Sequence, residues 1–176
     1  MNMRASLVCM VAAALFAHGG GNTFDEYHVK AAFLYNFAKF VEWPPNTFAA
    51  STDPVTICVA GRNPFGTMLE ELVQGKTAGG RTLAVRTLRK LQHASRCQIL
   101  FVAASEQKQA WVMLDQVAKT GILTVGESDE FMAVGGMVNL KLDGARVRIQ
   151  IAPDVVEHAK LLVSSRVLSL AEIVRK

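Results

Sequence analysis

Residues 28–45 read HVKAAFLYNFAKFVEWPP, and this stretch predicts the helix around which the domain is built. Tyr27 to Trp43 carries six of the thirteen aromatic residues of the chain (nine Phe, two Tyr and two Trp). Helical spacing of about 100° per residue gathers its apolar side chains in one arc of roughly 200°, interrupted only by Lys30. A one-sided surface helix needs a stripe of only about 100°. We therefore expect this helix to be covered from more than one direction and to end at Pro44-Pro45.

Two interpretations explain so wide an apolar arc. In the first, the helix lies between a sheet and a second helix. In the second, part of the arc meets a partner chain together with Tyr35 and Trp43 beside it, because aromatic residues concentrate in interface cores. The two interpretations are compatible with each other.

Residues 1–19 have the layout of a secretory signal peptide: a short basic start, an apolar run from Ala5 to Ala17, and small residues at the usual cleavage spacing. The apolar run is too short to span a bilayer of about 30 Å as a helix. No later segment is long and apolar enough to do so. We expect an exported, periplasmic protein that does not itself span the membrane, with its domain in residues 24–176.

Removal of the signal peptide leaves two cysteines, Cys58 and Cys97. An even count in an oxidising compartment favours one disulfide, which would close a loop of about 40 residues and stabilise the fold by roughly 4 kcal/mol. The alternative is a pair of buried free thiols. Their spacing matches no zinc or redox motif.

The rest of the chain alternates between strand and helix patterns, which is typical of an α/β fold. Asn63 is a plausible N-cap for a helix from Pro64 to Val73, and Ser164 for a last helix to Arg175. Ser105 is a plausible N-cap for a helix to Lys119, whose inward residues are expected to be Trp111, Leu114 and Val117 or Ala118. Strands are expected at residues 55–60, 81–88, 98–103, 122–125, 137–142 and 145–151, the last two joined by a two-residue Asp143-Gly144 turn. The sequence predicts a single domain, a three-layer sandwich of a mixed β-sheet with helices on both faces.

Composition and motifs argue against an enzyme and against nucleic acid binding. The histidines after residue 19 are isolated, and no zinc-binding, paired-carboxylate or Gly-x-Ser-x-Gly pattern occurs. The formal net charge of +4 is mild, and no aromatic residue is interleaved with the basic residues between Arg81 and Arg96. We predict no catalytic residues, no metal and no cofactor.

The turn Gly61-Arg-Asn-Pro-Phe-Gly66 joins a strand to a helix N-terminus, where backbone N–H groups can hold an anion. Arg62, Asn63 and Gly66 are therefore candidates for an anion-binding turn. Because the Walker A and dinucleotide patterns are both absent, a plain tight turn is the other interpretation.

Several segments resemble the YfiR/HmsC family of exported bacterial proteins, in family order and over essentially the whole chain after residue 24. They are residues 31–44 (AAFLYNFAKFVEWP), 61–66 (GRNPFG), 122–126 (ILTVG) with Phe131, 135–140 (GGMVNL) and 161–171 (LLVSSRVLSLA). The resemblance implies an α/β fold and a periplasmic repressor that binds a membrane-bound diguanylate cyclase. It also implies that Cys58 and Cys97 form the family's structural bridge. The family regulator has a second cysteine pair near the Gly-Gly-Met segment, and this chain has no cysteine there.

The resulting hypothesis is a periplasmic regulatory protein that binds the periplasmic domain of an inner-membrane diguanylate cyclase and represses it, lowering cyclic di-GMP signalling and biofilm formation. The candidate contact residues are Tyr35, Lys39, Trp43 and, on the last helix, Leu168. A homodimer is a further option. The alternative is a periplasmic small-molecule protein that binds an anion or a metabolite at the turn of residues 61–66.

Overall fold

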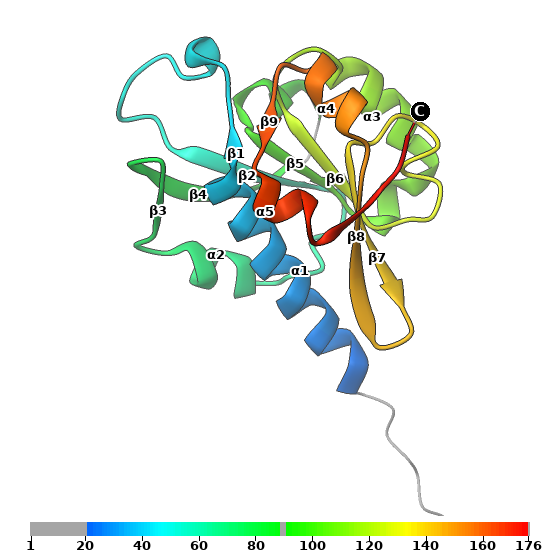
Figure 1. Cartoon of the computed structure of the whole chain (residues 1–176). Coiled ribbons are helices and arrows are strands. Elements are labelled where there is room, and N and C mark those ends of the chain that lie inside the picture. Colours follow the sequence, from blue (N-terminus) through cyan, green and yellow to red (C-terminus); the bar gives the residue numbers. More distant parts are fainter. Residues whose placement is uncertain (1–20, 89–90, 176) are drawn as a thin grey trace, which may run out of the picture.

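The computed structural model describes residues 21–88 and 91–175, in which an eight-stranded mixed sheet carries helices on both faces (Figure 1). The predicted α/β class, single domain and three-layer arrangement are confirmed. The predicted signal peptide, residues 1–19, lies outside the described residues. In the part of the chain that the structure describes, no helix combines the length and the apolar character that crossing a membrane requires.

The elements follow one another along the chain as strands with intervening helices. The strands are β1 (Val41–Glu42), β2 (Val55–Ala60), β3 (Thr77–Ala78), β4 (Arg81–Leu88), β5 (Ile99–Val102), β6 (Leu123–Gly126), β7 (Val138–Asp143), β8 (Arg146–Ile151), β9 (Leu162–Val163) and β10 (Ala171–Ile173). The α-helices are α1 (Gly21–Phe40), α2 (Met68–Val73), α3 (Ala110–Val117), α4 (Pro153–His158) and α5 (Ser165–Leu168). Short 3-10 helices are η1 (Pro45–Thr47), η2 (Leu91–Arg96) and η3 (Ala104–Gln109).

The sheet has the order β10-β8-β7-β6-β5-β2-β4-β3. Strands β4, β2, β5, β6 and β7 are parallel neighbours, whereas β8 runs antiparallel to β7 and β3 antiparallel to β4. In the sheet, β4 lies on one side of β2, and β5, which follows β4 in the sequence, lies on the other side. The strand order therefore reverses at β2. Crevices at the carboxyl ends of parallel strands form at such reversals.

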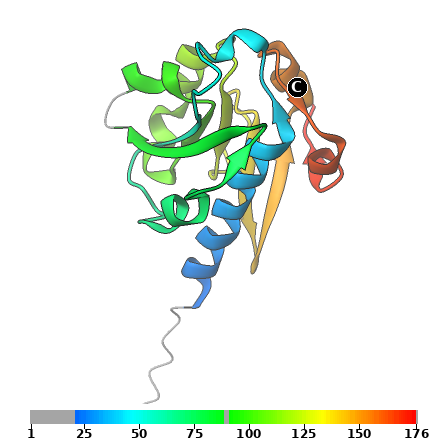
Figure 2. The same cartoon turned by 90° about the vertical axis from the view of Figure 1, so that its left-hand side faces the viewer.

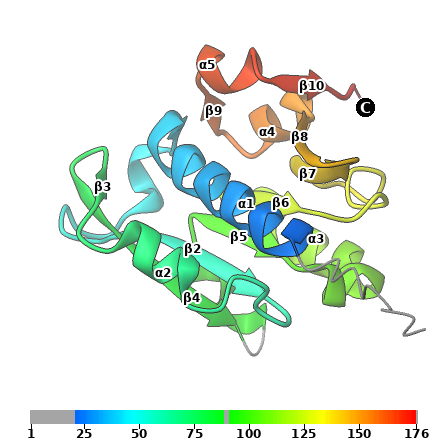
Figure 3. The ribbon, with the colours of Figure 1, turned by 90° about the horizontal axis from the view of Figure 1, so that it is seen from below.

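Side chains of the central strands alternate between two cores, as expected for strands buried on both faces. Ile57 and Val59 on β2 belong to the core that includes α1 and α2. Their neighbours Cys58 and Ala60 belong to the core that includes α3. Figure 3 shows α1 lying across the sheet beside α2.

Helix α1 is covered from several directions, as its wide apolar arc predicts. Leu34 and Phe37 are buried, at 0% and 1% exposure, and the helix contacts α2, β2, β8 and α5. Its first turns and the tip of the β7–β8 hairpin extend past the sheet side by side (Figure 2).

The first helix ends earlier than the sequence predicts. It stops at Phe40, and the next two residues form β1, which pairs antiparallel with β9. Proline disfavours the helical conformation of the residue before it, and β-branched Val41 suits a strand. Trp43 therefore lies after the helix and not on it.

Two other predicted helices begin later than expected. Asn63 does not cap α2, which starts at Met68 after Thr67, because the Asn63 side chain closes the turn before the helix instead. Ser105 lies in η3, and α3 starts at Ala110. The prediction that Trp111 points inward is wrong, since it is 60% exposed. The other predicted inward residues, Leu114 and Val117, are buried as expected, together with Ala110 and Met113.

The C-terminal elements also differ from the prediction. Asp143 pairs with Arg146, so the hairpin turn is Gly144-Ala145 and not Asp143-Gly144. Gly144 has φ 60°, as the first turn position of a type II′ hairpin requires. Ser164 caps α5 as predicted, its hydroxyl accepting the N–H of Arg166 at 3.3 Å. The helix ends at Leu168 and the chain continues as β10, because the outer edge of β8 offers free backbone groups to pair.

A disulfide joins Cys58 on β2 to Cys97 just before β5, with the two Cα atoms 5.8 Å apart. Both residues are buried in the core that α3 covers. Of the two alternatives that the sequence left open, the structure therefore contains the disulfide.

Gly126 and Gly136, in the family segments 122–126 and 135–140, leave room for the ring of Phe131. A Cβ on Gly126 or on Gly136 would overlap the side chain of Phe131, which is 1% exposed. Gly135 has φ 106°, a conformation that glycine adopts most readily. These residues thus pack the loop between β6 and β7 against its own aromatic side chain.

Candidate functional site

The polar side of α1 carries two of the predicted contact residues. Tyr35 and Lys39 are four positions apart and so lie on one helix face. The Lys39 ammonium is 5.4 Å from the centroid of the Tyr35 ring, and that of Lys76, in the loop after α2, is 5.0 Å from it. Tyr35 is half-buried and Lys39 is exposed. Both distances fall within the range of cation–π attraction.

A second ring next to these residues extends the basic character toward α5. Lys39 lies 5.4 Å and the Arg166 guanidinium 5.9 Å from the centroid of the Phe40 ring. We call these five residues the basic aromatic patch: Tyr35, Lys39, Phe40, Lys76 and Arg166. Among the ion pairs of the described residues, none involves a cation of this patch. The patch therefore presents positive charge over aromatic surface.

The other two predicted contact residues, Trp43 and Leu168, are half-buried against the rest of the domain. Trp43 is half-buried, and its indole N–H donates to the carbonyl oxygen of Gln98 at 3.3 Å, at the start of β5. Leu168 is half-buried against the core that includes α1. The structure thus brings Tyr35 and Lys39 into one patch and places Trp43 at the amino end of the parallel strands.

The turn of residues 61–66 lies at the carboxyl end of β2, where the strand order reverses. The N–H of Arg62 donates to the Ser105 hydroxyl at 3.0 Å. The Asn63 side chain accepts the N–H of Phe65 at 2.9 Å and donates to the carbonyl of Gly66 at 3.1 Å. Two backbone donors of the turn are thus engaged within the protein, and α2 begins only after Thr67. Anion binding here stays a prediction.

A buried charge cluster at the same edge of the sheet was missed by the sequence reasoning. Lys30 of α1, 2% exposed, makes ion pairs with Glu26 and, at 2.6 Å, with Glu127 directly after β6. The other oxygen of Glu127 accepts the N–H of Ala104 at 2.7 Å. The cluster therefore joins α1 to the loops after β5 and β6. Its signal in the sequence was the single lysine within an apolar arc.

Tyr27 belongs to this charge cluster. Its ring lies 4.8 Å from the Lys30 ammonium and packs edge-on against Phe65 at 5.6 Å. Burial, and then the negative charges of Glu127 and Glu26, raise the pKa of the Tyr27 hydroxyl well above its ordinary value. Tyr27 is thus a hydrogen-bonding, uncharged member of the cluster at neutral pH.

Metal-binding groups are not evident in the described residues: no three side chains of His, Cys, Asp or Glu are close enough together there to hold an ion. The predicted absence of a cofactor stays a prediction.

These features define an α/β sandwich with a mostly parallel sheet, a disulfide that joins β2 to the segment just before β5, and a basic aromatic surface centred on its first helix. The chain belongs to the YfiR/HmsC-like family, whose model matches residues 27–172. This match confirms the family resemblance of the sequence motifs.

Two solved structures are similar to this chain at low sequence identity, and the first of them shares its general fold. A conserved domain protein from Vibrio cholerae O1 biovar El Tor is 15% identical with a TM-score of 0.55, over 86% of this chain and 60% of that one. The ABC domain in complex with L-Trp from Streptococcus pneumoniae is 12% identical with a TM-score of 0.49, over 67% of this chain and 54% of that one. This chain thus spans little more than half of either protein.

Proposed function

We propose that the chain is a periplasmic regulatory protein that binds the periplasmic domain of an inner-membrane diguanylate cyclase and represses it. Repression would lower cyclic di-GMP and with it biofilm formation. The observation that carries this proposal is the family match over residues 27–172. The Cys58–Cys97 disulfide supports it, because disulfides persist in oxidising compartments such as the periplasm.

The basic aromatic patch is the surface we assign to the cyclase. Aromatic residues and arginine are enriched in interface cores, and cations that form none of the ion pairs of the described residues favour an acidic partner surface. Repression then follows from differential binding: the chain shifts the cyclase toward its inactive state by the difference in contact energy between the two states.

The first experiment asks whether the chain controls the cyclase in cells. Deleting the gene in its native host should raise cyclic di-GMP, measured by mass spectrometry, and the wild-type gene supplied on a plasmid should restore the original level. Unchanged cyclic di-GMP in the deletion strain would refute the regulatory role.

The second experiment locates the contact surface. Lys39→Glu reverses a charge within the patch, and Lys108→Glu makes the same change at an exposed lysine of η3. Lys39→Glu should fail to restore the low cyclic di-GMP level and should lose the cyclase in pull-downs from membrane fractions, whereas Lys108→Glu should behave as wild type. Equal behaviour of the two variants would assign the contact to another face.

A further inference from the structure

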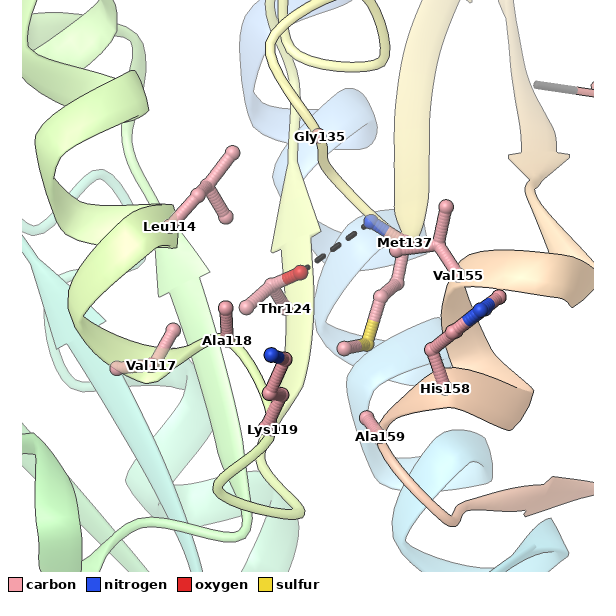
Figure 4. A pocket seen from close by; sticks show the side chains of 10 residues that line it. All are labelled: Leu114, Val117, Ala118, Lys119, Thr124, Gly135, Met137, Val155, His158 and Ala159. Atoms are coloured by element: carbon pink, nitrogen blue, oxygen red, sulfur yellow. Dashed lines mark hydrogen bonds between the residues drawn. The ribbon is translucent and has the colours of Figure 1, made fainter.

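A cavity of about 140 Å³ opens between α3, α4 and β6 (Figure 4). Four of its wall residues, Leu114, Val117, Met137 and Ala159, are apolar and at most 5% exposed. The complete lining is Leu114, Val117, Ala118, Lys119, Thr124, Gly135, Met137, Val155, His158 and Ala159. A cavity of roughly 150 Å³ is large enough to hold benzene, so this one, which is open on one side, has room for an apolar group of about that size.

The polar part of the lining is basic. Of the ten described residues that line the cavity, Lys119 and His158 can carry positive charge and none is a carboxylate. Figure 4 shows the Lys119 side chain rising between Ala118 and Met137, with its ammonium toward the cavity, whereas the His158 ring turns away. The Nδ1 atom of that ring lies 2.6 Å from the carbonyl oxygen of Asp154. Lys119 is therefore the cation that a ligand in the cavity would meet.

Lys119 occupies a backbone position that favours glycine. The N–H of Thr120 donates to the carbonyl of Val117 at 3.1 Å, Ala118 has φ −53° and ψ 132°, and Lys119 has φ 67°. These values describe a type II turn with Lys119 at the third position, where glycine is preferred because φ is positive. A lysine here is held in a conformation that its Cβ disfavours, and strained residues of this kind cluster at functional sites.

We propose that this cavity binds a small amphipathic carboxylate of about six carbons in all: its unbranched or branched alkyl tail lies between α3 and α4, and its carboxylate pairs with the Lys119 ammonium. The apolar wall accounts for the tail, and the lysine at the opening accounts for the charge. The site lies between α3 and α4, away from the basic aromatic patch on α1, and its test does not depend on the regulatory role proposed above.

The ligand class is tested with probes that differ only in the head group or in tail length. Hexanoate, titrated into the protein expressed from its full-length gene and followed by two-dimensional amide NMR, should shift signals of α3, β6 and α4, with Kd on the order of 1 mM for a fragment of this size. Butanoate should bind about 15-fold more weakly, at roughly fourfold per methylene removed. Hexan-1-ol should bind about two- to fivefold more weakly, the range of an exposed ion pair, and hexylammonium more weakly still.

The role of Lys119 is tested by a substitution that relieves the backbone and removes the charge. Lys119→Gly should keep or raise the melting temperature, because glycine accepts the positive φ, yet it should bind hexanoate no better than hexan-1-ol. Lys160→Gly is the matched control: Lys160 also has positive φ, 61°, but does not line the cavity. It should keep or raise the melting temperature and leave hexanoate binding as in wild type.

The proposal is overturned by any of three results. Hexanoate and hexylammonium binding equally well would remove the charge preference. Unchanged hexanoate affinity in Lys119→Gly would remove the lysine from the site. If the amide signals of α3 and α4 do not shift even at the highest hexanoate concentration, the probe binds at another site or does not bind at all.

Discussion

Removing the buried charge of Lys30 should destabilise the protein far more than removing an exposed charge from the same helix. In Lys30→Met the new side chain is unbranched and similar in length to the apolar stem of lysine, but it carries no charge. It leaves Glu127, whose side chain is 3% exposed, without its cation. Glu127 still accepts the hydrogen bond from the N–H of Ala104. That bond alone does not offset the free energy of hydration that the buried carboxylate has lost.

The magnitude follows from burial. Removing one partner of a buried ion pair costs about 3–5 kcal/mol, because a charge is left without compensation in a medium of low dielectric constant. Glu26 is 13% exposed and can turn toward water, so Glu127 carries most of the cost. A loss of this size is a large part of the typical 5–15 kcal/mol of total stability. The double variant Lys30→Met/Glu127→Gln removes both charges and should recover at least half of the loss.

The assay is equilibrium unfolding in urea, followed by circular dichroism at a fixed pH near 7.5. Lys39→Met is the control, because Lys39 is exposed on the same helix. It loses only exposed cation–π contacts, so it should change the free energy of unfolding by about 1 kcal/mol or less. If Lys30→Met costs no more than Lys39→Met, or if the double variant is as unstable as Lys30→Met, the cluster does not hold α1 in place through its charges.

Three further predictions concern stability. Reducing the disulfide between Cys58 and Cys97, whose sequence separation is 39, should lower the free energy of unfolding by about 4 kcal/mol; urea midpoints that coincide with and without reductant would contradict this. Because the folded state raises the pKa of Tyr27 above 10.0, the unfolded chain loses this proton first. Stability should then be unaffected by Tyr27 below pH 10 and should fall above it by up to about 1.4 kcal/mol per pH unit. Tyr27→Phe should remove that slope in alkaline unfolding curves. Gly126→Ala should cost about 1–3 kcal/mol by overpacking against Phe131, and adding Phe131→Leu should restore part of it; additive losses in thermal unfolding would argue against the contact.

The fold class was predictable because the strand patterns are strong. The continuous apolar run ending at Ala103 and the alternation from Arg81 to Leu88 became β5 and β4. Positions that depend on tertiary pairing were not predictable. Val41–Glu42 and Ala171–Ile173 form strands because β9 and the edge of β8 offer them partners, and no local pattern records those partners.

The candidate site was predictable only in part, for a similar reason. The half-buried Tyr35 and the exposed Lys39 follow from helical periodicity, but Lys76 and Arg166 join them from distant parts of the chain. Lys30 interrupts an apolar arc, which indicates a buried partner without naming it. The partner, Glu127, follows a strand that lies beside others only in the folded sheet.

The pairing of β1 with β9 has a consequence for the order in which the molecule is assembled. During synthesis, α1 is complete long before the C-terminal segments exist. Val41 can pair with Val163, and α1 can pack against α5, only when the last part of the chain has been made. Until then one flank of the helix stays uncovered, because loop closure over such a separation must precede the contact. We therefore expect the growing chain to need a holding factor on this helix, and chains truncated before β9 to aggregate rather than fold.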